Sequence, residues 1–136
     1  MTTSRTPGLI LFAHGARDPR WALPFEAVAE QVRAARPHCL LRLAYLEFMT
    51  PTLPEAAAAL AQAGCTQVEV LPLFLGTGGH LRRDLPLLMD ALRAEHPAVC
   101  FILHAAVGEM APVTQAMASV AAALLPMEQP ADTDAA

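Results

Sequence analysis

Two short stretches of the chain combine histidine, arginine and aspartate in the same order. Residues 14–18 read HGARD and residues 80–84 read HLRRD, so both contain His-x-x-Arg-Asp. An imidazole can bind a transition metal or exchange a proton near neutral pH, and a guanidinium group binds carboxylates. The arrangement therefore indicates chemistry that involves a metal ion, a proton or an anionic ligand.

Each histidine comes after an apolar run. His14 follows residues 8–13 (GLILFA), and His80 follows residues 67–75 (QVEVLPLFL) and a glycine-rich loop. A continuous apolar run is typical of a parallel strand that is covered on both faces. We therefore expect both histidines just beyond the carboxyl ends of buried strands.

Strand and helix patterns alternate along the chain. Further strands are expected at residues 39–47 and 99–107. Four helices are predicted by apolar residues at helical spacing: Phe25, Val28, Ala29 and Val32; Leu53, Ala56, Ala57, Leu60 and Ala61; Leu81, Leu85, Leu88 and Leu92; and Val113, Met117, Val120 and Leu124. The order β-α-β-α-β-α-β-α predicts an α/β fold, with an open four-stranded parallel sheet and helices on both faces. We expect the flavodoxin-like strand order 2-1-3-4.

Length and composition indicate one globular domain. The 136 residues are 54 % hydrophobic, which is enough for a single core. We expect a flexible N-terminus at residues 1–6, one domain at residues 7–126 and a disordered tail at residues 127–136.

Several functional classes are disfavoured by composition. A formal net charge of −4 disfavours general nucleic-acid binding, which needs a basic surface. No apolar run approaches the ~20 residues that span a bilayer, so no membrane contact is expected. The opening MTTSRTPG lacks the apolar segment of a signal peptide, and a cytoplasmic location is expected. Three cysteines without a Cys-x-x-Cys pair indicate neither a disulfide framework nor a structural zinc site.

The expected fold brings the two histidines together. In an open parallel sheet, ligands bind beyond the carboxyl ends of the strands, where the strand order reverses. For the order 2-1-3-4 this point lies between strands one and three, so His14 and His80 should face one another. Glu47, at the end of strand two, should lie on the same rim. Two imidazoles and a carboxylate suit a divalent ion such as Co²⁺, Fe²⁺, Ni²⁺ or Zn²⁺, and they leave coordination positions open.

The rim also carries residues suited to a bulky anion. Gly76, Gly78 and Gly79 would let such a ligand approach the backbone closely. Four arginines surround the rim of this otherwise acidic chain and should attract carboxylates: Arg17, Arg20, Arg82 and Arg83. Asp18 and Asp84 are interpreted as helix caps, because aspartate at a helix start accepts from free backbone amides.

Other interpretations of these residues remain open. The histidines could be ordinary loop residues, and Glu47 could be a solvated strand end. A histidine phosphatase is disfavoured because Ala13 stands where an arginine is expected directly before the histidine. GTGGH has neither the lysine of a P-loop nor the glycine spacing of a dinucleotide site, so no nucleotide is expected. A metal-binding carrier or storage module that catalyses no reaction is the main alternative to an enzyme.

Three segments carry a resemblance to a known family. HGARDPR at residues 14–20, YLEFMTPTLPEA at residues 45–56 and LPLFLGTGGHLRRDLP at residues 71–86 resemble the short CbiX-type class II chelatases. That family includes sirohydrochlorin cobaltochelatases and ferrochelatases. The similarity extends over residues 7–125, with Ala13 in place of a glycine that is common before the first histidine.

The resemblance implies insertion of Co²⁺ or Fe²⁺ into sirohydrochlorin, in cobalamin or siroheme biosynthesis and without nucleotide hydrolysis. By position, His14 and His80 match the metal-binding histidines of the family, and Glu47 matches an acidic residue of its active site. Short members of the family are similar to one half of the two-lobed chelatases. The resemblance therefore implies that this chain corresponds to one such half and works as a homodimer. A histidine is suited to accept a proton that the macrocycle loses.

Overall fold

The sheet has the expected architecture. Residues 6–128 of the chain are described here from a computed structural model. Four parallel strands form one sheet in the order β2-β1-β3-β4. The strands are β1 (Pro7–Ala13), β2 (Leu40–Tyr45), β3 (Gln67–Pro72) and β4 (Cys100–Leu103). The α/β class, the parallel sheet and its strand order are therefore confirmed.

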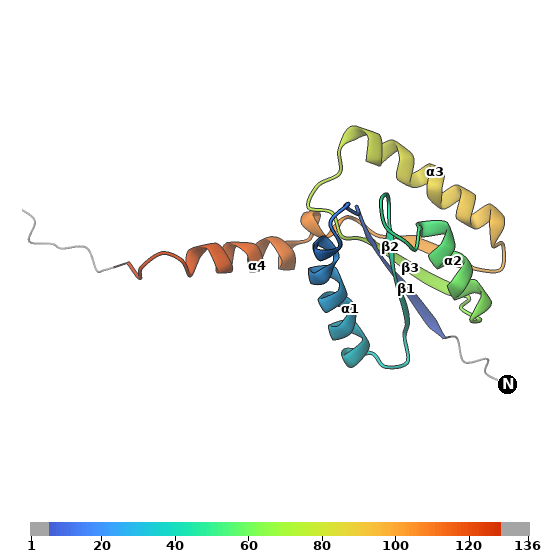
Figure 1. Ribbon diagram of the computed structural model, residues 1–136, viewed down its shortest axis with the longest axis horizontal. Helices are drawn as coiled ribbons and strands as arrows, with labels where there is room; N and C mark the ends of the chain where they lie inside the picture. The colour runs from blue at the N-terminus through green and yellow to red at the C-terminus, as the bar shows by residue number, and fades with distance from the viewer. Residues whose placement is uncertain (1–5, 129–136) are drawn as a thin grey trace, which may run out of the picture.

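Helices cover both faces of this sheet (Figure 1). One side holds α1, and the other holds α2 and α3, in agreement with right-handed crossovers. The helices are α1 (Leu23–Ala35), α2 (Leu53–Gln62), α3 (Gly79–Glu95) and α4 (Ala111–Ala122), with short 3-10 turns η1 (Pro19–Ala22) and η2 (Val107–Glu109). No helix within residues 6–128 has the length and apolarity needed to cross a membrane.

The core follows the alternation of side chains along β1. Ile10 and Phe12 are fully buried against α2 and α3, whereas Leu11 packs on the other face with Ala29 of α1. Successive residues of a strand point to opposite faces, so a strand covered on both sides is apolar throughout. This explains why the run GLILFA shows no polar residue.

Local signals set the position of α2. Thr52 and Glu55 form a reciprocal capping box, in which each side chain accepts from the backbone amide of the other residue. Leu53 and Leu60 then point into the core from the same helix face. α2 therefore begins directly after its cap Thr52, at Leu53, which is the first residue of the predicted apolar face.

Three strands are shorter than predicted. β2 ends at Tyr45, so Glu47 lies in the following loop and not at the end of the strand. β3 ends at Pro72 and not at Leu75. β4 ends at Leu103 and not at residue 107, because this edge strand pairs only with β3, whose proline has no amide hydrogen to donate.

The last helix does not cover the sheet. α4 forms where the apolar spacing predicts it, but it projects away from the body (Figure 1). None of its residues is fully buried. The expected flexible N-terminus and disordered tail fall mostly on residues 1–5 and 129–136, which lie outside the described residues.

The extent of burial predicts that truncating two helical leucines has very different effects on stability. Leu60 is fully buried in α2, whereas Leu87 of α3 is 67 % exposed. We expect Leu60→Ala to lower the free energy of unfolding by about 2–5 kcal/mol, because it leaves a cavity. Leu87→Ala is the control and should change it by less than about 0.5 kcal/mol. Urea denaturation followed by circular dichroism measures both, and equal losses would contradict this assignment of the core.

Candidate metal site at the carboxyl edge of the sheet

His14 and His80 line one cavity beyond the carboxyl ends of β1 and β3. The cavity has a volume of about 310 Å³. Its lining consists of His14, Leu46, Phe74, Gly76, Gly78, His80, Leu81 and Asp84. The predicted meeting of the two histidines at the point where the strand order reverses is therefore confirmed.

His14 is held in place by two neighbours. Its Nε2 lies 2.8 Å from Oε1 of Glu47, and the two side chains are 53 % and 47 % exposed. A carboxylate can only accept, so the imidazole N–H donates this hydrogen bond. The ring of His14 is steeply inclined to that of Phe74, with an interplanar angle of 74° and ring centroids 6.2 Å apart, and Phe74 in turn packs on Phe12 of the core. The imidazole is therefore positioned while one side stays open to solvent.

Backbone contacts join the loops after β1 and β2. The amide of Leu46 donates to Ala13 O at 2.9 Å, and the amide of Glu47 donates to His14 O at 3.0 Å. Gly15 has φ = +94°, and a Cβ there would collide with the carbonyl oxygen of Glu47. Glycine is therefore required next to His14 both for its dihedral angle and for this close approach.

His80 reaches the cavity from the first turn of α3. Gly78 is the N-cap of this helix and provides no side-chain cap. A Cβ built on Gly76, Gly78 or Gly79 would meet no atom within 4 Å, so the loop borders open space. The amide of Gly108 in η2 donates to Phe74 O at 3.0 Å and holds the start of this loop.

Of the two helix caps predicted at aspartates, the one at Asp18 is confirmed and the one at Asp84 is wrong. Asp18 does cap η1, accepting from the amide of Arg20 at 2.9 Å, and the side-chain hydrogen bond from Arg20 lowers the pKa of this carboxyl group. Asp84 lies well inside α3 and lines the cavity. It stands one helical turn after His80, and this i, i+4 spacing places both side chains on the same helix face. The spacing was the signal that could have assigned Asp84 to the site.

None of the four arginines predicted to surround the site belongs to the lining of this cavity. Arg20 pairs with Asp18 at 2.9 Å. The guanidinium of Arg17 lies 4.9 Å from the ring centroid of Phe48, as in a cation–π contact, and borders a neighbouring hollow of about 360 Å³. These two guanidinium groups therefore already have partners within the protein.

On the other lip, Arg82 has two partners. Its Nε donates to Thr77 at 3.2 Å, and its Nη2 lies 3.7 Å from Glu109 of η2. Arg83 is exposed. The pair Arg82–Arg83 therefore combines one arginine that ties the glycine loop to η2 with one that faces solvent.

The three proposed ligands do not form a closed metal site. Within residues 6–128, no three His, Cys, Asp or Glu side chains are grouped as they would be to hold an ion. The structure brings Glu47 to His14 and places His80 on the same cavity. Such an arrangement presents an ion with nitrogen and oxygen donors but leaves coordination positions open.

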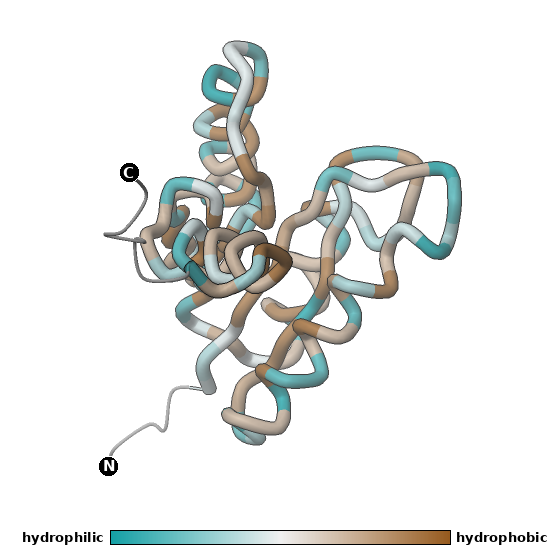
Figure 2. The backbone as a smooth tube through the Cα atoms, turned by 90° about the vertical axis from the view of Figure 1, so that its left-hand side faces the viewer, coloured by the Kyte–Doolittle hydropathy of each residue, from teal (hydrophilic) through white to brown (hydrophobic). Residues whose placement is uncertain are grey.

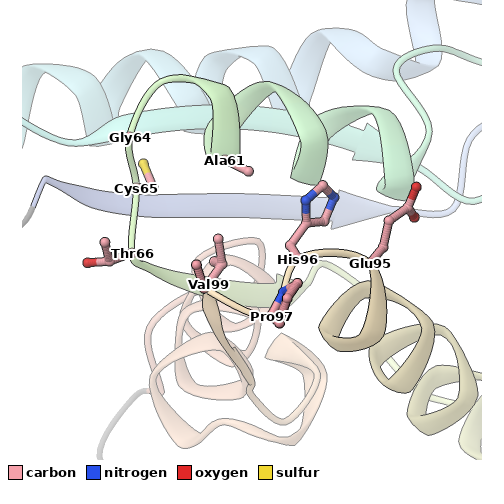
Figure 3. A pocket seen from close by; sticks show the side chains of 9 residues that line it. Ala61, Gly64, Cys65, Thr66, Glu95, His96, Pro97 and Val99 are labelled. Carbon is pink, nitrogen blue, oxygen red and sulfur yellow. The ribbon is translucent and has the colours of Figure 1, made fainter.

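A second hollow lies at the opposite end of the sheet (Figure 3). It has a volume of about 380 Å³ and is formed by the connections from α2 to β3 and from α3 to β4. His96 and Cys65 line it, and burial raises the pKa of the Cys65 thiol above its usual value. A raised pKa makes a thiol less reactive, so Cys65 is not suited to act as a nucleophile there.

Comparison with known proteins decides the family. The model of the CbiX family matches residues 8–123. This chain belongs to the CbiX family. A CbiX protein from Marinobacter aquaeolei VT8 has the same fold, with a TM-score of 0.77 and 33 % identity over 87 % of this chain and 96 % of that one.

Other relatives are matched over part of their length. Sirohydrochlorin cobaltochelatases of Methanococcus maripaludis and Saccharolobus solfataricus are 33 % and 37 % identical. The alignments cover 60 % of this CbiX chain in both cases, and 56 % and 62 % of these relatives. SirB from Bacillus subtilis, solved with Fe³⁺, shares the fold with a TM-score of 0.76 and 22 % identity, over 90 % of this chain and 49 % of SirB.

Two glycines with the same dihedral angle test the close approach beside His14. Gly15 and Gly64 both have φ = +94°, but only Gly15 would clash, because nothing lies within 4 Å of a Cβ at Gly64. We expect Gly64→Ala to cost about 1–2 kcal/mol of stability through its dihedral angle alone. Gly15→Ala should cost about 1–3 kcal/mol more, because the loops must separate. Thermal and urea unfolding measure both, and equal costs would show that the approach of Gly15 to Glu47 is unimportant.

Proposed function

We propose that this chain is a chelatase that inserts Co²⁺ or Fe²⁺ into sirohydrochlorin without nucleotide hydrolysis, in cobalamin or siroheme biosynthesis. Ni²⁺ is a further metal substrate that the same ligands suit. The observation that carries the proposal is that His14, which is bonded to Glu47, lines the same cavity as His80 in a chain of the CbiX family. We place the reaction in the cytoplasm, with residues 7–126 as the chelatase domain.

The His14–Glu47 pair has a suitable separation for two adjacent ligands of one ion. Ligand atoms at about 2.1 Å from a metal ion are about 3 Å apart when they subtend a right angle. The observed 2.8 Å between Nε2 and Oε1 is close to this value. A metal ion bound between these two atoms would displace the proton on Nε2 of His14. His80 lines the same cavity and would have to move closer to His14 and Glu47 to become a third ligand.

Such a site favours transfer over storage. Insertion requires the pyrrole nitrogens of the macrocycle to replace protein ligands and to lose two protons. A site with three ligands or fewer leaves positions at which those nitrogens can bind. When His14 or His80 releases the metal ion, its imidazole becomes free to accept a proton.

The surroundings suit the carboxylates of sirohydrochlorin, which carries eight of them on a flat ring. We assign Arg17, Arg20, Arg82 and Arg83 to these carboxylates, since guanidinium groups form paired hydrogen bonds with them. Binding would compete with the internal partners of Arg20 and Arg82. Gly78 and Gly79 leave room for the ring edge, because no protein atom occupies the space where a side chain would lie.

We further propose that the working unit is a homodimer. A cavity of about 310 Å³ is at the lower end of the range for pockets that enclose drug-sized ligands. One chain can therefore cover only part of a large macrocycle. A second copy could cover the other side.

The decisive test is the insertion rate of purified protein with Co²⁺, Fe²⁺ or Ni²⁺ and sirohydrochlorin, followed by the absorbance change of the macrocycle. We expect His14→Ala and His80→Ala each to lower the rate by about 100-fold or more, the size of effect typical of an acid–base group. His38→Ala is the matched control, because His38 lines a different hollow at the far end of the sheet. Circular dichroism verifies that each variant is folded.

Two outcomes would contradict the proposal. Full rates in both active-site variants would show that the site is misplaced. Metal binding by the wild-type protein without any increase over the spontaneous insertion rate would identify a carrier or storage module.

Metal affinity separately tests the role of Glu47. We expect Glu47→Gln to weaken Co²⁺ binding by about 10- to 100-fold, since an amide retains the hydrogen bond but not the charge of a ligand. Glu69→Gln is the control, because Glu69 also lies 2.8 Å from a histidine, His104, but outside the cavity. Isothermal titration with Co²⁺ alone measures both, and equal affinities would remove Glu47 from the ligand set.

A further inference from the structure

An exposed aromatic side chain stands next to the His14–Glu47 pair. Figure 2 colours the backbone by hydropathy, and brown and teal alternate along α3, the uppermost helix, as is usual for a helix with one buried face. A single exposed hydrophobic residue on such a helix needs no explanation. Phe48 lies instead in the loop between β2 and α2, directly after Glu47, and it is 58 % exposed. Neither helix amphipathicity nor core packing therefore explains an aromatic residue at this position.

The backbone at Phe48 is strained. Its φ of +65° lies in the left-handed region, where a bulky residue is rare. The amide of Met49 donates to the carbonyl oxygen of Glu47 at 2.8 Å, which closes a three-residue turn with Phe48 at its centre. The same carbonyl oxygen occupies the space where a Cβ of Gly15 would lie. The turn therefore ties the position of the Phe48 ring to the contact that holds Glu47 beside His14.

The Phe48 ring lies against the guanidinium group of Arg17. The guanidinium carbon is over the ring, 4.9 Å from its centroid, as in a cation–π contact. Arg20 and Arg82 both donate N–H groups to acceptor side chains of the protein. Within residues 6–128, Arg17 donates no hydrogen bond to a protein oxygen, so its N–H groups remain available to a ligand. Arg17 is therefore held in place while its donors stay free.

Arg17 and Phe48 line a hollow of about 360 Å³ that begins next to the proposed metal site. Gly15 and Glu47 make the close approach beside His14, and Arg17 and Phe48 follow them within two residues along the chain. The uncharged residues of the lining are Ala16, Pro19, Ala22, Tyr45, Met49 and Thr50. Glu26 also belongs to the lining and would repel an anion. A carboxylate that enters this hollow is therefore attracted to Arg17.

We propose that Phe48 is a positioning residue, which holds Arg17 so that its guanidinium group binds one carboxylate of the macrocycle next to the His14–Glu47 pair. A mobile arginine loses side-chain freedom when it binds, which lowers affinity, whereas Arg17 is ordered before the ligand arrives. Such pre-organisation also accounts for the strained turn, because backbone strain is found at binding sites where it serves function. The inference rests on the proposed function for the identity of the ligand.

The test is the dissociation constant of sirohydrochlorin in the absence of metal, measured by isothermal titration. We expect Arg17→Gln to raise it by about 10-fold or more, the effect of losing a hydrogen bond between charged groups. Phe48→Asn should raise it by about 2- to 10-fold, the effect of ordering one long side chain on binding. Arg36→Gln is the control for a lost positive charge, because Arg36 lines a hollow at the far end of the sheet. Screening by salt should keep its effect below about twofold.

Two further variants separate positioning from a direct or structural role. Phe48→Tyr keeps an aromatic ring and should bind as tightly as the wild type. In the Arg17→Gln background, Phe48→Asn should add less than about twofold, because Phe48 acts only through Arg17. Asparagine tolerates a positive φ, so Phe48→Asn alone should not lower the melting temperature measured by circular dichroism. Its loss of affinity then cannot arise from unfolding.

Three results would overturn this inference. An equal loss of affinity on Phe48→Asn with and without Arg17 would mean that the ring contacts the macrocycle directly. An unchanged dissociation constant in Phe48→Asn would mean that Arg17 needs no support from the ring. Both results leave the proposed function intact, because insertion is measured separately with the variants of His14 and His80. A wild-type protein that does not bind sirohydrochlorin would contradict the proposed function as well.

Discussion

The candidate site depends on one close backbone approach, between Gly15 and Glu47. Two amide hydrogen bonds join the loops after β1 and β2 there, and Gly15 leaves no room for a side chain between them. This contact brings the carboxylate of Glu47 to the imidazole of His14, although neither residue belongs to a strand. The parallel pairing of β1 with β2 sets the register in which the loops meet.

The remaining parts of the site are held by the other neighbour of β1. Phe74 follows β3 and contacts the ring of His14, and η2 holds the loop that contains Phe74. The glycine loop then leads into α3 and delivers His80 to the cavity. The order β2-β1-β3 therefore explains why three segments distant in the sequence contribute to one edge. Rigid strands set the positions, and the loops supply the chemical groups.

Much of this arrangement could be predicted from the sequence, because apolar periodicity is a local property. The apolar patterns located the four strands, and the order in which they pair was inferred from the habits of parallel α/β folds and agrees with the structure. The position of each histidine after a strand then placed both on one rim. The lengths of β3 and β4 were harder to predict from the sequence. Pro72 affects its own strand and also the pairing of its edge neighbour, and that second effect depends on which strands are adjacent. Asp84 was misassigned because its aspartate resembles a cap, whereas the actual start of α3 is at the glycines. The location of α4 could not be predicted, since a helical pattern indicates an apolar face but not the surface that covers it.

The sequence position of α4 has a consequence for biosynthesis. α4 follows every element of the main core in the chain, and the buried cluster around Ile10 and Phe12 includes none of its residues. During translation the body can therefore fold before α4 has left the ribosome, since a domain folds once its own elements are available. The apolar helix would then emerge next to a finished domain. Its apolar side chains would remain accessible to chaperones until a packing surface covers them.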